Sequence, residues 1–366
     1  MAFRFDEDQV ALADGVESLL LGRAKGDYAR AVAAGEAEWR DLWDAVSELG
    51  IPTMAIPEEA DGLGLGPIEL TAVCERVGRH LAPAPIVATA GGFVPTAVAA
   101  GGAALAAVER VAGGAAATLA YVDDSDPATI ALRDGKLVVR EVPVPDAERV
   151  ELIGFVVAGE DDGAPPSGAG QADAAALAIV AAADLEAMPV EGFDRTRPLA
   201  LLSTPVDGIA ATAVPLPNGI ADLAVAFTTA AAELVGNAAR MLDLAVEYAR
   251  ERRQFGVAIG SFQGVKHRLA DALVTLERAR SLTYRAAVEC AGPDRAAALR
   301  AAHMAKAAAS DAATEVGRSA VQVHGGIGIT AEADISLLYL RARQGAMQLG
   351  GRDAHYAALA ARGATG

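Results

Sequence analysis

The sequence has 366 residues, of which 52% are hydrophobic and 4% aromatic, and its net charge of −17 excludes the basic face that binding to nucleic-acid phosphates requires. Two cysteines, Cys74 and Cys290, are too few for a disulfide framework or a cysteine metal site, so we expect no metal. Gly and Pro interrupt the apolar runs and the N-terminus does not resemble a signal peptide, so we expect no membrane partner and a cytoplasmic protein.

The first third of the chain has the pattern of amphipathic helices. Residues 6–49 carry helical periodicity, and the glycine-rich segment 61–67 precedes a helix that Pro83 and Pro85 end. A further helix is predicted over about residues 94–110. We therefore predict an N-terminal helical domain over residues 1–116.

The middle of the chain changes to short β-branched runs. These runs lie at residues 118–122, 136–140, 153–157 and 177–180, and Asp, Gly and Pro separate them. Residues 133–136 predict a hairpin turn, and residues 159–170 predict a mobile surface loop. We predict a small antiparallel β-barrel or sandwich domain over residues 117–217.

Helical patterning returns in the last third. Long helices are predicted at about residues 223–250, 262–290 and 295–323, with Asp294 as an N-cap, and the last helices at 335–362. We predict a C-terminal four-helix bundle over residues 218–366. The fold class is therefore mainly α with a central β domain.

Two motifs in this helical region carry the side chains of a ligand site. The first is Arg252–Gly256 with Phe262-Gln263, and the second is Gln322–Gly326. Arg suits a pyrophosphate, Gln suits hydroxyls or ring edges, and Gly lets a ligand approach the main chain. A solvated basic helix surface is the alternative interpretation of the first motif. The candidate cofactor-binding residues are Arg252, Gln254, Phe255, Gln263, Gln322, Gly325 and Gly326.

The order of these elements and motifs resembles the acyl-CoA dehydrogenase family along nearly the whole chain. The resemblance rests on Ile56–Glu59 with Gly62–Gly64, on Arg252–Gly256 with Phe262-Gln263, and on Gln322–Thr330. It is closest to an actinobacterial heteromeric subgroup that acts on steroid side-chain thioesters.

The resemblance implies FAD bound across a subunit interface, with an acyl-CoA substrate and an electron-transfer flavoprotein or similar acceptor. The neighbouring subunit's bundle would hold the adenosine and pyrophosphate, so Arg252 would face the pyrophosphate with Gln254 and Phe255 beside it. Gln263, Gln322, Gly325 and Gly326 would complete that contribution.

The sequence departs from the family at the residue that performs the chemistry. Most members carry the catalytic base as a Glu in a Tyr-Glu-Gly-Thr-like segment, and the corresponding segment here is Met347–Gly351, with Leu349 at the base position. The family's other base position falls near Ala226. Glu233 remains a candidate because its apolar neighbours could raise its pKa. A surface or ion-paired glutamate is the commoner case.

A second departure lies in the β domain, where the family's hydroxyl-bearing flavin contacts correspond to Asp123-Asp124. These acids would repel the negative charge on reduced flavin.

Three hypotheses follow. The chain supplies the FAD clamp to a paralogous subunit in a heterotetramer, it is a homomeric dehydrogenase with Glu233 as its base, or it is a scaffolding paralogue without FAD.

Overall fold

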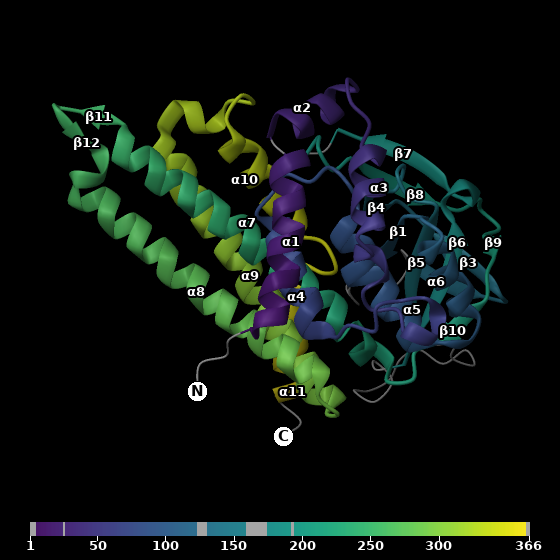
Figure 1. Ribbon diagram of the computed structural model, residues 1–366. Helices are drawn as coiled ribbons and strands as arrows, with labels where there is room; N and C mark the ends of the chain where they lie inside the picture. Colours follow the sequence, from purple (N-terminus) through teal and green to yellow (C-terminus); the bar gives the residue numbers. More distant parts are fainter. Residues whose placement is uncertain (1–4, 25, 123–129, 159–173, 192–193, 364–366) are drawn as a thin grey trace.

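The computed structural model describes residues 5–24, 26–122, 130–158, 174–191 and 194–363. Figure 1 shows a helical bundle beside a region of strands, with the N-terminal helices lying across both. The predicted loop at 159–170 and the Asp123-Asp124 pair both lie outside the described residues.

The N-terminal region is helical, as predicted, but one predicted helix is divided. Gly101 and Gly102 have φ values of 65° and 51°, which end a helix and favour glycine, so residues 94–110 form two helices instead of one. The helices are α1 (Glu7–Arg23), α2 (Gly26–Ala34), α3 (Arg40–Glu48), α4 (Pro67–Gly78), the π-helix η3 (Val87–Phe93), α5 (Val94–Ala100) and α6 (Leu105–Ala112). Short 3-10 turns lie at Ile51–Thr53, Glu58–Ala60 and Gly102–Ala104.

The central strands form three small sheets, in the orders β1-β5-β6-β10, β2-β3-β9 and β4-β8-β7. Their bounds are β1 (Ala117–Ala120), β2 (Ile130–Arg133), β3 (Lys136–Val139), β4 (Val142–Pro145), β5 (Leu152–Ala158), β6 (Ala175–Ala181), β7 (Glu186–Val190), β8 (Leu199–Ser203), β9 (Ile209–Ala210) and β10 (Ala213–Pro215). The predicted hairpin is confirmed, because Arg133 pairs with Lys136 across the β2–β3 turn.

The prediction of a wholly antiparallel domain is wrong at one pair of strands. β1 and β5 run parallel, with Ala117 paired to Leu152 and Ala120 to Phe155. Between them the chain builds β2, β3 and β4 in the other two sheets and returns in the same direction. A parallel pair needs such a long connection.

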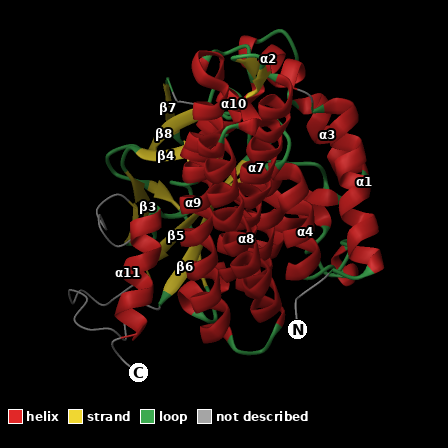
Figure 2. Ribbon diagram, turned by 90° about the vertical axis from the view of Figure 1, so that its left-hand side faces the viewer, coloured by secondary structure: helices red, strands yellow, loops and turns green. Residues whose placement is uncertain are grey.

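The C-terminal region is a bundle of three long helices with two shorter ones packed on it (Figure 2). The bounds are α7 (Ala224–Glu251), α8 (Gln263–Ala291), α9 (Arg295–His324), α10 (Asp334–Gly345) and α11 (Arg352–Gly363), with a hairpin of β11 (Arg253–Gln254) and β12 (Val257–Ala258) between α7 and α8. Short 3-10 helices lie at Gly219–Leu223 (η6), Ile259–Ser261 (η7) and Gly325–Ile329 (η8). Asp294 caps α9, as predicted, by accepting a hydrogen bond from the Ala297 N–H at 2.9 Å.

Helix α7 is the centre of the molecule. Together with η6 it forms the stretch Gly219–Glu251, which is long and apolar enough to cross a membrane, but 72% of its most apolar window is buried inside the protein. Glycines let α4 pack directly on it, since a Cβ at Gly78 would lie 2.0 Å from the Glu233 carbonyl oxygen and one at Gly236 1.9 Å from that of Glu75. This crossing fixes the backbone that carries Glu233.

Candidate functional site

The first predicted motif forms the exposed tip between α7 and α8. Phe255 and Gly256, with φ values of 52° and 81°, make the two-residue turn that joins β11 to β12. The turn leaves Phe255 92% exposed. The Arg252 side chain, at the end of α7, has no hydrogen-bond or ion-pair partner among the described residues. Its guanidinium is therefore free for an external anion.

The second motif ends α9 and lies beside the first. The His324 ring stacks on Tyr248 of α7 with 4.5 Å between ring centroids, which joins the two motifs at one end of the bundle. Gly325 follows with a φ of 66°, a conformation that favours glycine. All seven predicted cofactor-binding residues are exposed: Arg252, Gln254, Phe255, Gln263, Gln322, Gly325 and Gly326.

This end of the bundle has the donor set that a pyrophosphate with an attached nucleoside requires. An unpaired guanidinium can bind phosphate oxygens through two parallel hydrogen bonds, and the amides of Gln254, Gln263 and Gln322 can donate or accept. Because the donors are exposed, a ligand bound to them would keep part of its surface outside this chain. The residues therefore fit an anion bound at the surface of the bundle.

A small cavity is lined by both positions at which the resemblance places a base. Ala226 and Leu349 line it together with Glu233, between α7, η3 and β1. Its volume is about 20 Å³, enough for about one water molecule. Neither Ala226 nor Leu349 can accept a proton, and an acyl chain does not fit in this space.

Glu233 is buried but is tied to an arginine. Its carboxylate accepts hydrogen bonds from both terminal nitrogens of Arg197, at 2.8 and 3.3 Å. Arg197 also lies 3.3 Å from the Asp146 carboxylate and 3.3 Å from the Gln348 amide oxygen. Burial opposes the charge of Arg197, but the ion pairs with Glu233 and Asp146 outweigh it and raise the pKa of the guanidinium. A carboxylate held in this way is a poor proton acceptor.

A buried basic cluster holds the segment that contains Leu349. Lys306 of α9 donates hydrogen bonds to the carbonyl oxygens of Ala346 and Gly350, at 3.2 and 3.3 Å. Burial lowers the pKa of Lys306 to about 7, although the charge of Glu233 opposes the shift. His355 of α11 lies 3.1 Å from the Leu349 carbonyl oxygen through Nε2 and 2.7 Å from His303 through Nδ1.

His355 is the member of this cluster that carries no charge at neutral pH. Burial, with Lys306 and His303 nearby, lowers the pKa of His355 to about 3.

The sequence did not predict the roles of Arg197, Lys306 and His355. A lysine inside an alanine-rich helix was the one available signal, because a buried ammonium group requires nearby acceptors.

A larger opening lies next to the small cavity, between the strands and the same segment. Its volume is about 340 Å³, and Leu119–Val122, Glu141, Pro143–Pro145 and Met347–Gly351 line it. Leu349 lies in the walls of both spaces. The opening therefore adjoins the position where the resemblance places the base.

The sequence matches known families over most of its length. Residues 6–109 match the family described as "Acyl-CoA dehydrogenase, N-terminal domain", and residues 221–364 match "Acyl-CoA dehydrogenase, C-terminal domain". The chain belongs to the acyl-CoA dehydrogenase family. It is 32% identical to the acyl-CoA dehydrogenase IpdE2 of Mycobacterium tuberculosis over 353 residues, which cover 94% of this chain and 93% of the relative.

Solved structures of acyl-CoA dehydrogenases have the same fold. A chain of the "Tcur3481-Tcur3483 steroid ACAD G363A variant" superposes with a TM-score of 0.82 at 26% identity, covering 98% of this chain and 99% of the other. A chain of the ChsE4-ChsE5 complex from Mycobacterium tuberculosis gives 0.83 at 24% identity, with full coverage of both.

The family resemblance and the fold class are thereby confirmed. An acyl-CoA dehydrogenase is an oxidoreductase, and FAD is the cofactor, as expected. The roles of the seven exposed residues and of Glu233 stay predictions.

Proposed function

We propose that this chain is one subunit of a heteromeric acyl-CoA dehydrogenase, in which it supplies the surface for the adenosine and pyrophosphate of FAD. A paralogous partner supplies the catalytic base, the flavin cradle and the acyl pocket. The carrying observation is the contrast between an exposed, unpaired Arg252 and a cavity of about 20 Å³ with Leu349 and Ala226 at the base positions.

The reaction requires a carboxylate near the acyl α-carbon. α,β-Dehydrogenation removes a proton from the α-carbon, while FAD, when bound, accepts the hydride from the β-carbon. A general base must reach that proton within hydrogen-bond distance and be free to accept it. In this chain the nearest described carboxylate in the cavity wall is Glu233, which is paired with Arg197. The base therefore comes from another chain.

The residues proposed for the adenosine and pyrophosphate could bind those groups even though this chain supplies no base or flavin cradle. Arg252 would bind the pyrophosphate, since its guanidinium is exposed and unpaired. Gln322 and the exposed backbone of Gly325 and Gly326 would contact the nucleotide, and the Tyr248–His324 stack would keep the two motifs in register. These groups position the cofactor and perform no proton transfer.

The names of similar proteins support a two-component enzyme. The Tcur3481-Tcur3483 protein and the ChsE4-ChsE5 complex are each named as a pair of chains, and the first is named a steroid dehydrogenase. We accordingly propose a steroid side-chain CoA thioester as substrate, a heterotetramer as the assembly, an electron-transfer flavoprotein or similar acceptor, and a cytoplasmic location.

The visible spectrum tests this proposal. The chain expressed alone is expected to be colourless, and the chain co-expressed with a paralogous dehydrogenase that carries the missing Glu is expected to be yellow. Bleaching of that colour by an acyl-CoA would show a competent reaction centre. A yellow chain that is reduced by acyl-CoA without any partner would contradict the proposal. Absence of flavin with every partner tried would favour the FAD-free scaffold instead.

A second candidate function is a homomeric dehydrogenase with Glu233 as its base, and the position of Glu233 in the wall of the small cavity favours it. We expect Glu233→Gln to leave turnover per bound FAD almost unchanged in the co-expressed assembly, because the base lies on the partner. Steady-state rates normalised to flavin absorbance give the measurement. Loss of turnover with FAD still bound would identify Glu233 as the base.

A further inference from the structure

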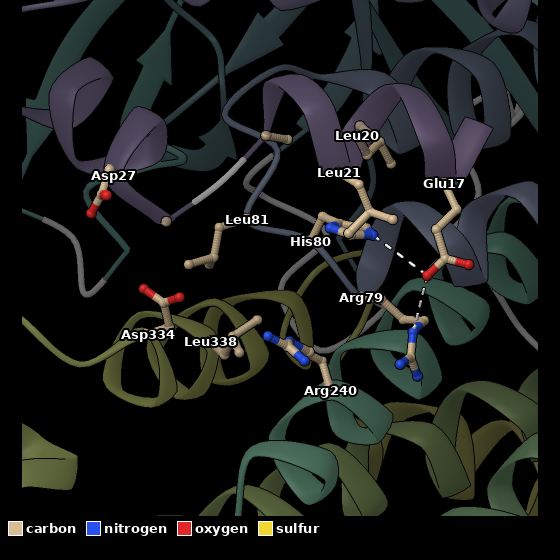
Figure 3. A pocket seen from close by; sticks show the side chains of 12 residues that line it. Glu17, Leu20, Leu21, Asp27, Arg79, His80, Leu81, Arg240, Asp334 and Leu338 are labelled. Carbon is tan, nitrogen blue, oxygen red and sulfur yellow. Dashed lines mark ion pairs between the residues drawn. The ribbon is translucent and has the colours of Figure 1, made fainter. Parts of the chain in front are cut away.

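A separate open pocket lies on the side of the bundle where the N-terminal helices meet α7 and α10 (Figure 3). Its volume is about 390 Å³, within the range of small-molecule sites. α1, α2, the end of α4, α7 and α10 contribute its walls. Among the residues that the structure describes, it shares none of its lining with the small cavity or with the opening beside it.

Arg240 of α7 gives this pocket an unpaired positive charge. Its side chain is half-buried and has no hydrogen-bond or ion-pair partner among the described residues. The other arginine in the wall, Arg79, is instead paired with Asp243 at 2.8 Å and with Glu17 at 3.5 Å. Figure 3 shows Arg240 on the opposite side of the pocket from α1, apart from the Glu17 ion pairs. The pocket can therefore accept one anionic group at Arg240.

His80 adds an unsatisfied polar atom to the same wall. Its Nε2 is buried without a hydrogen bond, since the closest carboxylate oxygen, Oε1 of Glu17, is 3.7 Å away. Burial lowers the pKa of His80, Glu17 opposes the shift, and the charges of Arg79 and Arg240 add to it. This shift favours the neutral ring, which can donate a hydrogen bond to a bound oxygen through a protonated Nε2.

The far end of the pocket carries the opposite charge. Asp27 and Asp334 lie there, and Arg30 pairs with both of them, at 3.2 and 2.6 Å. Two carboxylates against one guanidinium leave that end with an excess negative charge, which would repel a second anionic group. The wall between the two ends is formed by the apolar side chains Leu20, Leu21, Ala24, Leu81 and Leu338.

We propose that this pocket binds a small amphipathic monoanion, a carboxylate on a short apolar chain, with the carboxylate on the Arg240 guanidinium. An arginine recognises a carboxylate through two parallel hydrogen bonds, and the leucines would take up the apolar body. The acids at the far end select against dianions of the same length. The site is distinct from the proposed FAD and acyl-CoA sites, so it stands whether or not the subunit division described above is correct.

Calorimetric titration of the full-length chain with hexanoate tests the proposal, using hexanamide and adipate as matched probes. Hexanoate is expected to bind, and the neutral hexanamide and the dianionic adipate to bind at least about tenfold more weakly. Arg240→Gln is expected to weaken hexanoate binding by about tenfold or more. Arg300→Gln, at an exposed arginine of α9 outside this pocket, is expected to leave it unchanged.

Several results would overturn the proposal. These are equal hexanoate affinity in the Arg240→Gln variant, equal affinity for hexanamide, and no binding heat from a chain whose far-ultraviolet spectrum shows it to be folded. The same titration on the co-expressed assembly separates a ligand site from a subunit contact. If the free chain binds hexanoate and the assembly does not, the pocket receives an acidic side chain of a neighbouring subunit, and the ligand assignment is wrong.

Discussion

Arg252→Ala is expected to remove most of the FAD from the co-expressed assembly. Hydrogen bonds to a charged group contribute about 1.5–3 kcal/mol, so their loss weakens cofactor binding by about ten- to a hundredfold. The substitution should cost the fold little, because the Arg252 side chain is exposed and contacts no partner among the described residues. The ratio of flavin to protein absorbance after gel filtration gives the measurement.

Arg278→Ala is the matched control for that experiment. Arg278 is also an exposed arginine of the bundle, but it lies in the middle of α8, several turns beyond Gln263. The control should keep the wild-type flavin content. Full flavin content in Arg252→Ala, with the assembly intact, would show that the pyrophosphate is bound elsewhere and would remove the main support for the clamp.

Arg197→Leu is expected to lower the free energy of unfolding by about 3–5 kcal/mol. It would leave the buried carboxylate of Glu233 without its bidentate partner and weaken the pairing of Asp146, and an uncompensated buried charge has a cost of this size. Urea unfolding followed by circular dichroism measures the change in the free energy of unfolding. The protein concentration is kept fixed, because the stability of an oligomer depends on it.

The double variant Arg197→Leu with Glu233→Leu decides whether the cost comes from the orphaned carboxylate. If it does, the double variant should be more stable than Arg197→Leu alone, because both charges of the pair are then absent. Arg318→Leu breaks an ion pair with Glu315 in which both side chains are more than half exposed, and it should cost less than about 1 kcal/mol. An equally small loss for Arg197→Leu would contradict this account of the buried network.

The helices of the C-terminal region could be predicted from the sequence because their end signals are local. The predicted helix 262–290 is found at 263–291, and the α9 start follows from Asp294, whose capping hydrogen bond involves its own neighbours. The exposed motif at Arg252 is likewise contiguous in sequence. Such features depend on residues a few positions apart, which a pattern along the chain records.

The features that the sequence did not predict depend on distant pairings. The partner of β1 is 35 residues further along, and no alternation within either strand distinguishes a parallel from an antiparallel neighbour. Arg197 lies between two strands, 36 residues before the glutamate that it pairs with. Glu233 is buried among its apolar neighbours and is half of an ion pair, which is the commoner case for a helical glutamate. The sequence could not identify Arg197 as the partner, because apolar neighbours along a helix do not show which distant side chain the carboxylate meets.

The backbone at Leu349 has a consequence for whether the missing base could be regained. Leu349 has a φ of 54° in a segment held by Lys306 and His355, so the turn is maintained by α9 and α11 and not by the residue at its centre. A glutamate at 349 would therefore enter a preformed turn. Leu349 also lines the opening of about 340 Å³, so that carboxylate would adjoin both spaces. Under the proposed division between subunits, one substitution could thus restore a carboxylate at the base position, while the flavin cradle would still have to come from the partner.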